Sequence, residues 1–225
     1  MIIKSVFRRC LLFLLIFSML SLTACAEGLM GKLGFDTHDY RGEDVIAVHA
    51  PDSEIAVKLS EMTKALTVSS PILTLFFGAK EASDACRDAI LNHMLRTGYA
   101  QYAGNGALLA MAAEAYPQMQ LNVLIPASDF ESVVYATFGG SQKITNKNGT
   151  LFRYLDRVDA YTTASLPLES DVETHVLLLE ETERTYRLYF VNTLDAVTSP
   201  EYFALVIKRS DGSLYFRELS ESGRK

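Results

Sequence analysis

The spacing of apolar residues changes at Gly140, and this change constrains the fold more than any other feature of the sequence. Before Gly140 the apolar residues recur with the period of amphipathic helices, and after it they alternate or form short runs, as in strands. Helices followed by strands predict an α+β domain, with a mainly helical half over 45–140 packed on an antiparallel sheet half over 141–219. Residues 220–225 are expected to be a tail.

The helical half carries start and stop signals for helices. Pro51 and Ser53 precede an amphipathic stretch, Gly98 suits a helix stop, Pro117 ends another helix, and Ser128 has the capping-box spacing to Glu131. The stretch ending before Pro117 is so apolar that we expect it to be nearly all buried. The predicted helices cover about 53–67, 81–97, 107–116 and 128–138.

Other segments of this half are short or ambiguous. Residues 44–49 form an apolar run typical of a strand, and 99–106 is expected to be a loop. Residues 71–77 fit either a buried strand or a second helix, and 121–125 fits a short strand, a helix or a linker. Periodicity alone does not decide between these alternatives.

The sheet half is predicted to be an antiparallel meander. Asn148-Gly149, between two short runs, favours a tight hairpin there, and Asp211-Gly212 joins the last two strands. Leu188 is expected to face the helices, with Tyr186 and Phe190, while Arg187 and Tyr189 face the other side. The layout loosely resembles that of cystatin-like and nuclear-transport-factor-like domains, a likeness of arrangement that no motif carries.

The first residues have the order of an export signal. Residues 1–9 carry three basic side chains and no acid, and Leu11–Leu22 is an apolar run. This run is well short of the roughly 20 apolar residues that span a bilayer, which favours a secretory signal. The alternative is an uncleaved anchor helix over 7–30, which Glu27 and Gly28 would interrupt.

The run ends in Leu22-Thr23-Ala24-Cys25, which resembles the lipobox of bacterial lipoproteins. The resemblance implies a signal peptide over 1–24, cleavage between Ala24 and Cys25, and a diacylglycerol thioether on Cys25, detectable with palmitate. It also implies a protein of the bacterial cell envelope, anchored in the cell membrane on its extracytoplasmic side. Residues 25–44 are then a tether. Beyond the lipobox, no domain family is recognised.

Charge limits the class of partner. The whole chain has a formal charge of −6, and removing residues 1–24 takes away three bases and no acid, leaving 18 basic and 27 acidic residues, or −9. Nucleic acid requires clustered basic residues, so it is not an expected partner. We expect no metal and no cofactor.

Cys86 is the candidate nucleophile of the mature chain. With His93 or His175 and then Asn192, it follows the residue order of papain-like enzymes. However, no family signature surrounds it, and it lies on the apolar stripe of its predicted helix, which favours a core residue. His93 is two helical turns away, too far for a hydrogen bond.

Three other groups of residues suggest chemistry only weakly. Asp36-Thr37-His38-Asp39, near Asp44 and His49, offers metal ligands. Asp84 and Asp88 lie four residues apart on one predicted helix, where a solvated face explains them. A basic group near the predicted hairpin suggests contact with anionic wall polymer or lipid headgroups. It comprises Lys143, Lys147, Arg153 and Arg157. The glycines of 104–106 and the pair Gly139-Gly140 are expected to be turns, because they lack the preceding strand and the following lysine of a phosphate-binding loop.

Together these features favour a non-enzymatic, lipid-anchored protein whose α+β domain binds a cell-wall ligand or a neighbouring envelope protein. Tyr189 and Tyr215, on the outer sheet face, mark where a groove is expected. The alternatives are an envelope hydrolase that uses Cys86 or a carboxylate pair, and a structural subunit of an envelope complex. No catalytic residue is assigned.

Overall fold

The computed structural model describes residues 38–68, 70–77, 79–140, 144–164 and 171–224. The chain divides into two units, Met1–Gly42 and Glu43–Lys225. Of the first unit, the described part includes the short helix η1 (Tyr40–Gly42), where Asp39 accepts a hydrogen bond from the Arg41 backbone N–H. All other elements named below belong to the second unit.

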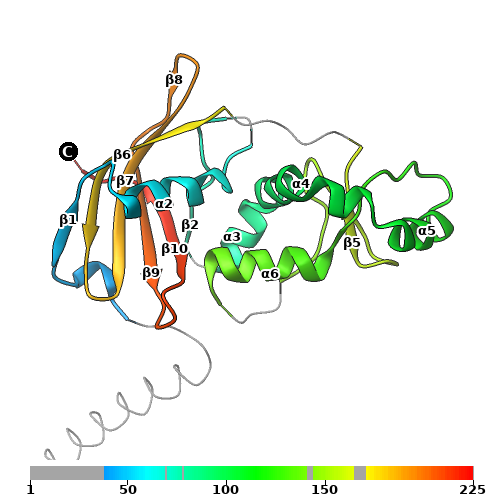
Figure 1. Cartoon of the computed structure of the whole chain (residues 1–225), viewed down its shortest axis with the longest axis horizontal. Coiled ribbons are helices and arrows are strands. Elements are labelled where there is room, and N and C mark those ends of the chain that lie inside the picture. Colours follow the sequence, from blue (N-terminus) through cyan, green and yellow to red (C-terminus); the bar gives the residue numbers. More distant parts are fainter. Residues whose placement is uncertain (1–37, 69, 78, 141–143, 165–170, 225) are drawn as a thin grey trace, which may run out of the picture. The chain divides into compact units, whose positions relative to one another are not determined.

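The second unit has an α+β fold built on a seven-stranded antiparallel sheet (Figure 1). The strand order is β1-β6-β7-β9-β10-β2, with β8 paired to β7, so the predicted meander β6-β7-β9-β10 forms the centre of the sheet. These strands are β1 (Ala47–His49), β2 (Phe76–Phe77), β6 (Glu173–Glu181), β7 (Thr185–Leu194), β8 (Val197–Thr198), β9 (Tyr202–Lys208) and β10 (Leu214–Glu221). The helical half thus supplies both edge strands, and β10 extends into the predicted tail.

A second, smaller sheet has the order β3-β5-β4. Its strands are β3 (Ile125–Pro126), β4 (Arg153–Leu155) and β5 (Ala160–Thr162). The segments left open in the sequence analysis are therefore mostly irregular chain, in which only β2 and β3 pair as short strands. The likeness to cystatin-like domains stays a prediction.

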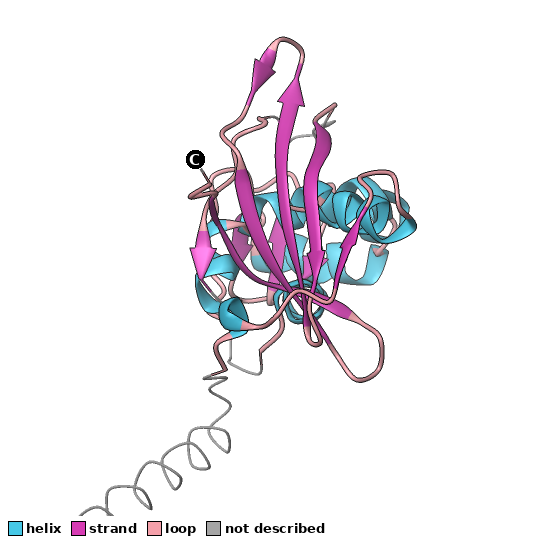
Figure 2. Cartoon of the chain, turned by 90° about the vertical axis from the view of Figure 1, so that its left-hand side faces the viewer, coloured by secondary structure: helices cyan, strands magenta, loops and turns pink. Residues whose placement is uncertain are grey.

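The helices lie on one side of the large sheet (Figure 2), but they do not all pack on it: the helices Glu54–Lys64 and Ala127–Phe138 contact β6 and β10, whereas the helix Gly106–Ala115 lies near the small sheet (Figure 1). They are α2 (Glu54–Lys64), α3 (Ala79–Ala85), α4 (Arg87–Ala103), α5 (Gly106–Ala115) and α6 (Ala127–Phe138). As expected, Leu188 and Phe190 are fully buried in the core cluster while Arg187 and Tyr189 on the opposite face stay partly exposed. We call these the inner and outer faces of the sheet.

The prediction of one helix over 81–97 followed by a loop is wrong in two respects. The helix is divided at Cys86, whose φ of −102° and ψ of 11° are non-helical, into α3 and α4. The chain also continues as helix through Gly98, with a local kink there, to Ala103. Gly98 therefore acts as a kink and not as a stop, because glycine tolerates helical and non-helical backbone angles alike.

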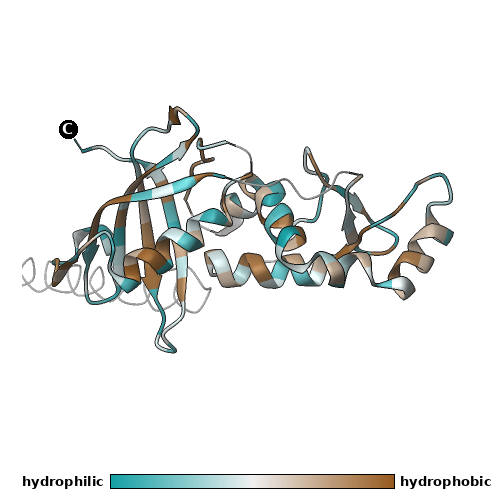
Figure 3. Cartoon of the chain, turned by 45° about the horizontal axis from the view of Figure 1, so that its top comes forward, coloured by the Kyte–Doolittle hydropathy of each residue, from teal (hydrophilic) through white to brown (hydrophobic). Residues whose placement is uncertain are grey.

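The expectation that α5 is nearly all buried is also wrong. Only Ala112 of this helix is fully buried, and Met111 is exposed, although α5 is apolar over most of its length (Figure 3). The helix packs by one side on a small separate cluster that includes Tyr116, Leu124 and Leu155. Seven of its ten residues are alanine or leucine, which favour a helix whether or not they are buried, so composition alone overstated its packing.

One turn prediction and one helix-cap prediction failed for identifiable reasons. Among the described residues, Asn148-Gly149 does not join two paired strands: β4 begins only at Arg153 and pairs with β5. Asp88 holds the chain before β4 by accepting hydrogen bonds from the backbone N–H groups of Thr150 and Phe152 at 2.6 and 3.2 Å. At the start of α6, Ser128 does not cap the helix, because the helix begins at Ala127 and its cap position is Pro126, two residues before Ser128.

Candidate functional site

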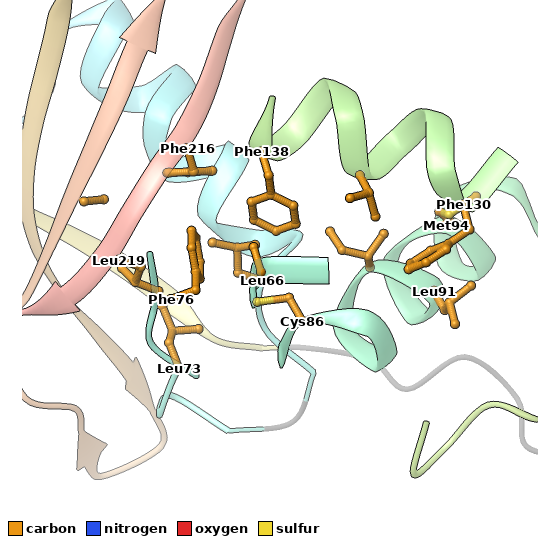
Figure 4. Packing of buried hydrophobic residues seen from close by; sticks show 14 of the residues in the cluster. Leu66, Leu73, Phe76, Cys86, Leu91, Met94, Phe130, Phe138, Phe216 and Leu219 are labelled. Atoms are coloured by element: carbon orange, nitrogen blue, oxygen red, sulfur yellow. The ribbon is translucent and has the colours of Figure 1, made fainter. Parts of the chain in front are cut away.

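Cys86 is a core residue. Its side chain is 3% exposed and lies in the main cluster with Leu66, Phe76 and Phe138 (Figure 4). Burial raises the pKa of the thiol from its ordinary value of 9.0 to about 12. A thiol in this environment stays protonated at neutral pH and is not a nucleophile.

The structure does not join Cys86 to the other members of the proposed nucleophile set. His93 on α4 is half-buried, with Nδ1 3.4 Å from Arg96 Nη2, and burial together with the Arg96 charge lowers its pKa. His175 lies on β6, where its Nε2 is 2.8 Å from Thr193 Oγ1.

Asn192 is fully occupied elsewhere in the sheet. It is buried, its side chain accepts a hydrogen bond from Thr174 Oγ1 at 2.8 Å, and its backbone N–H donates to the Ser199 hydroxyl oxygen at 2.9 Å. Its Nδ2 donates to the Pro71 carbonyl at 3.3 Å. These bonds fix the sheet to the segment before β2.

The carboxylate pair Asp84 and Asp88 binds other parts of the protein. Asp84 Oδ1 pairs with Arg87 at 2.8 Å and its Oδ2 with Lys147 at 2.9 Å. Partial burial acts to raise the pKa of Asp84, but the hydrogen bonds from these two cations outweigh it and hold the pKa below its ordinary value. With Asp88 bound to the loop at Thr150, both carboxylates have structural partners.

The proposed metal ligands lie in two places. Asp36 falls outside the described residues, while the His38 ring contacts the Tyr40 ring edge-on at 4.6 Å. His49 lies on β1 in the second unit. Within the described ranges, no group of three or more His, Cys, Asp and Glu side chains is placed to hold a metal ion.

The basic group near the predicted hairpin is partly used within the protein. Lys147 pairs with Asp84, and Arg157 Nη1 donates to the Ala115 carbonyl at 3.1 Å while its guanidinium lies over the Tyr116 ring. Arg153 is exposed, and Lys143 falls outside the described residues.

The two outer-face tyrosines have intramolecular partners. Tyr189 packs on Phe203 with ring centroids 5.2 Å apart and lies under the Arg224 guanidinium. Arg209 lies over the Tyr215 ring. Both rings therefore have stacking partners within the protein, and the groove expected beside them stays a prediction.

Two hollows lie along one side of α2, and neither was foreseen. The first has a volume of about 470 Å³ and the second about 540 Å³. They adjoin, because Lys58 lines both. The first is lined by His49, Ser53, Glu54, Ile55 and Lys58, and the second by Lys58, Glu61, Met62, Ala65, His93, Ala136 and Thr137.

A polar cluster on the inner sheet face holds His49 at the first hollow. His49 Nε2 lies 2.6 Å from Glu181 Oε2, and Lys208 Nζ donates to Glu181 Oε1 at 2.9 Å. Lys208 also donates to the Thr182 carbonyl at 2.6 Å and lies over the Tyr186 ring. The hydrogen bond from Lys208 lowers the pKa of Glu181, and the hydrogen bond with His49 lowers it further, although partial burial acts to raise it.

Comparison with protein-family models, with curated protein sequences and with solved structures found no match to this chain. Ala24 and Cys25 lie outside the described residues. In the part of the chain that the structure describes, none of the helices has the length and apolar character needed to cross a bilayer.

Proposed function

We propose that this chain is a bacterial lipoprotein, cleaved between Ala24 and Cys25 and anchored by a lipid on Cys25 at the extracytoplasmic side of the cell membrane. The observation that carries the proposal is the order of three signals: a basic start, an apolar run, and Leu-Thr-Ala-Cys directly after it. Two or more acyl chains hold a protein at a bilayer where one chain does not.

We further propose that the folded body is a non-catalytic domain that binds a ligand or a neighbouring envelope protein along α2. Two adjoining hollows on that helix support this role, with Lys58 between them. The hydrolase alternative is less favoured, because the thiol of Cys86 is buried and the carboxylates of Asp84 and Asp88 have partners within the protein.

Metabolic labelling with palmitate tests the anchor. The Cys25→Ala variant is expected to lose the label and to stay uncleaved. Cys10→Ala is the matched control, since it removes a thiol from the same segment outside the lipobox, and it should label like the wild type. Equal labelling of both variants would rule out Cys25 as the lipid site.

Site-specific photo-crosslinking in intact cells tests the binding surface. A photoreactive side chain at Lys58 or Met62 should give a reproducible adduct, whereas the same group at the exposed Arg153 should not. Adducts of equal yield at all three positions, or at none, would contradict a binding surface along α2.

A further inference from the structure

Strand β1 is an edge of the large sheet. Of the strands that the structure describes, only β6 pairs with it, in the register Ala47↔Glu181 to His49↔Leu179. An edge strand presents backbone N–H and C=O groups on its second side, which makes it a template for another extended chain.

Apart from its short length of three residues, this edge lacks the side-chain protection that natural edge strands often carry. Ile46 and Val48 are 64% and 63% exposed, and no lysine, arginine or proline lies between Asp44 and Pro51. Charged residues, prolines or bulges normally prevent edges from pairing. An exposed, apolar edge without lysine, arginine or proline is therefore a surface suited to a partner.

The first hollow lies at the same edge. It is bordered by His49 from β1 and by the first turns of α2, which contribute Ile55 and Lys58. Because successive strand residues point to opposite faces, Val48 lies on the outer face when His49 lies on the inner face beside the hollow. A chain paired with β1 would place alternate side chains against Val48 and into the hollow.

Charge indicates which side chain the hollow accepts. Lys58 is exposed and lines the hollow, and no acidic side chain among the described residues pairs with it. Glu54 also borders the hollow, but it occupies the first turn of α2, where the positive end of the helix stabilises a carboxylate. The positive charge that an incoming acidic side chain meets in the hollow is the Lys58 ammonium.

We infer that β1 and α2 together bind an extended peptide segment of a partner protein, which adds to the sheet as a further strand. Apolar side chains of the segment cover Ile46 and Val48 on the outer face, and an acidic side chain enters the hollow toward Lys58. Backbone pairing supplies affinity and the hollow supplies specificity, as in other strand-addition complexes. The inference rests on the proposed binding function and names its partner chemistry.

The test measures binding of blocked peptides, about eight residues long, to the full chain in detergent micelles by fluorescence anisotropy. In one peptide valine alternates with glutamate, in the second valine alternates with lysine, and the third is the glutamate peptide with every second backbone amide methylated. We expect the glutamate peptide to bind about tenfold or more tightly than either of the other two, a difference of about 1.4 kcal/mol.

Variants locate the binding to the edge. Val48→Lys should weaken the glutamate peptide about tenfold or more, while Val197→Lys, the same change at an exposed valine of β8, should leave it unchanged. Lys58→Glu should reverse the preference between glutamate and lysine peptides. Thermal unfolding of each variant is the control that checks whether the fold is retained.

Four results would overturn the inference: unchanged binding to the Val48→Lys variant, equal binding of the methylated peptide, no binding of any peptide, or a dimer that Val48→Lys dissociates. The last result would assign the edge to a second copy of the chain. A position-dependent crosslink at Met62 together with any of these results would leave the proposed binding function standing and remove only the strand-addition mode.

Discussion

The reactivity of Cys86 can be predicted quantitatively from its surroundings. With the pKa raised from 9.0 to about 12, the thiolate fraction at pH 8 falls from about one in ten to about one in ten thousand. Since only the thiolate attacks alkylating reagents, ionisation alone slows the folded protein about a thousandfold, and the 3% exposure of the residue slows access further.

The assay is alkylation by iodoacetamide at pH 8, followed by mass spectrometry of the peptide that contains Cys86. The folded full chain should react at least about a thousandfold more slowly than the chain in guanidinium. A Val197→Cys variant provides an exposed thiol in the same fold and should react at nearly the unfolded rate. If folded Cys86 reacted within about tenfold of that control, the burial argument would be refuted and the hydrolase alternative restored.

Two further predictions concern the sheet. Gly139→Ala should lower the free energy of unfolding in urea by about 1–3 kcal/mol more than Gly212→Ala does. Both glycines have a positive φ, but a Cβ at Gly139 would lie 2.5 Å from the Tyr215 ring, whereas a Cβ at Gly212 would meet open space. Equal losses of stability in the two variants would contradict this. Glu181→Gln should cost about 1–2 kcal/mol at pH 7, because the Lys208 bond lowers the folded pKa of Glu181. That stabilisation is present above the ordinary pKa of 4.5 and is lost as the pH falls through the folded pKa, so a deficit that persists unchanged at pH 2 would refute it.

The parts of the fold that local sequence predicts are those that local interactions determine. The stripe through Ile55 and Leu59 gives α2, with Ser53 at its N-cap as expected from the start signal. The alternation around Leu188 gives β7 with its buried and open faces. Both signals are complete within a single segment, so the sequence of that segment is sufficient.

The failures involve partners distant in sequence. Nothing near Asn148-Gly149 indicates that Asp88 binds the following loop, and nothing in the apolar stretch of α5 indicates that only one side finds a partner. The hollow at Lys58 depends on His49 from a separate element, and its supporting Glu181 lies at the end of β6. A surface assembled from distant segments leaves no spacing pattern to find.

Mass spectrometry of the N-terminal peptide, taken from the protein in native membranes, tests the central claim most directly. The proposal that this is a lipoprotein predicts a chain of residues 25–225 whose first residue, Cys25, carries a diacylglycerol thioether. A membrane-bound chain that still begins at Met1, or one that begins after residue 24 with an unmodified Cys25 thiol, would contradict it.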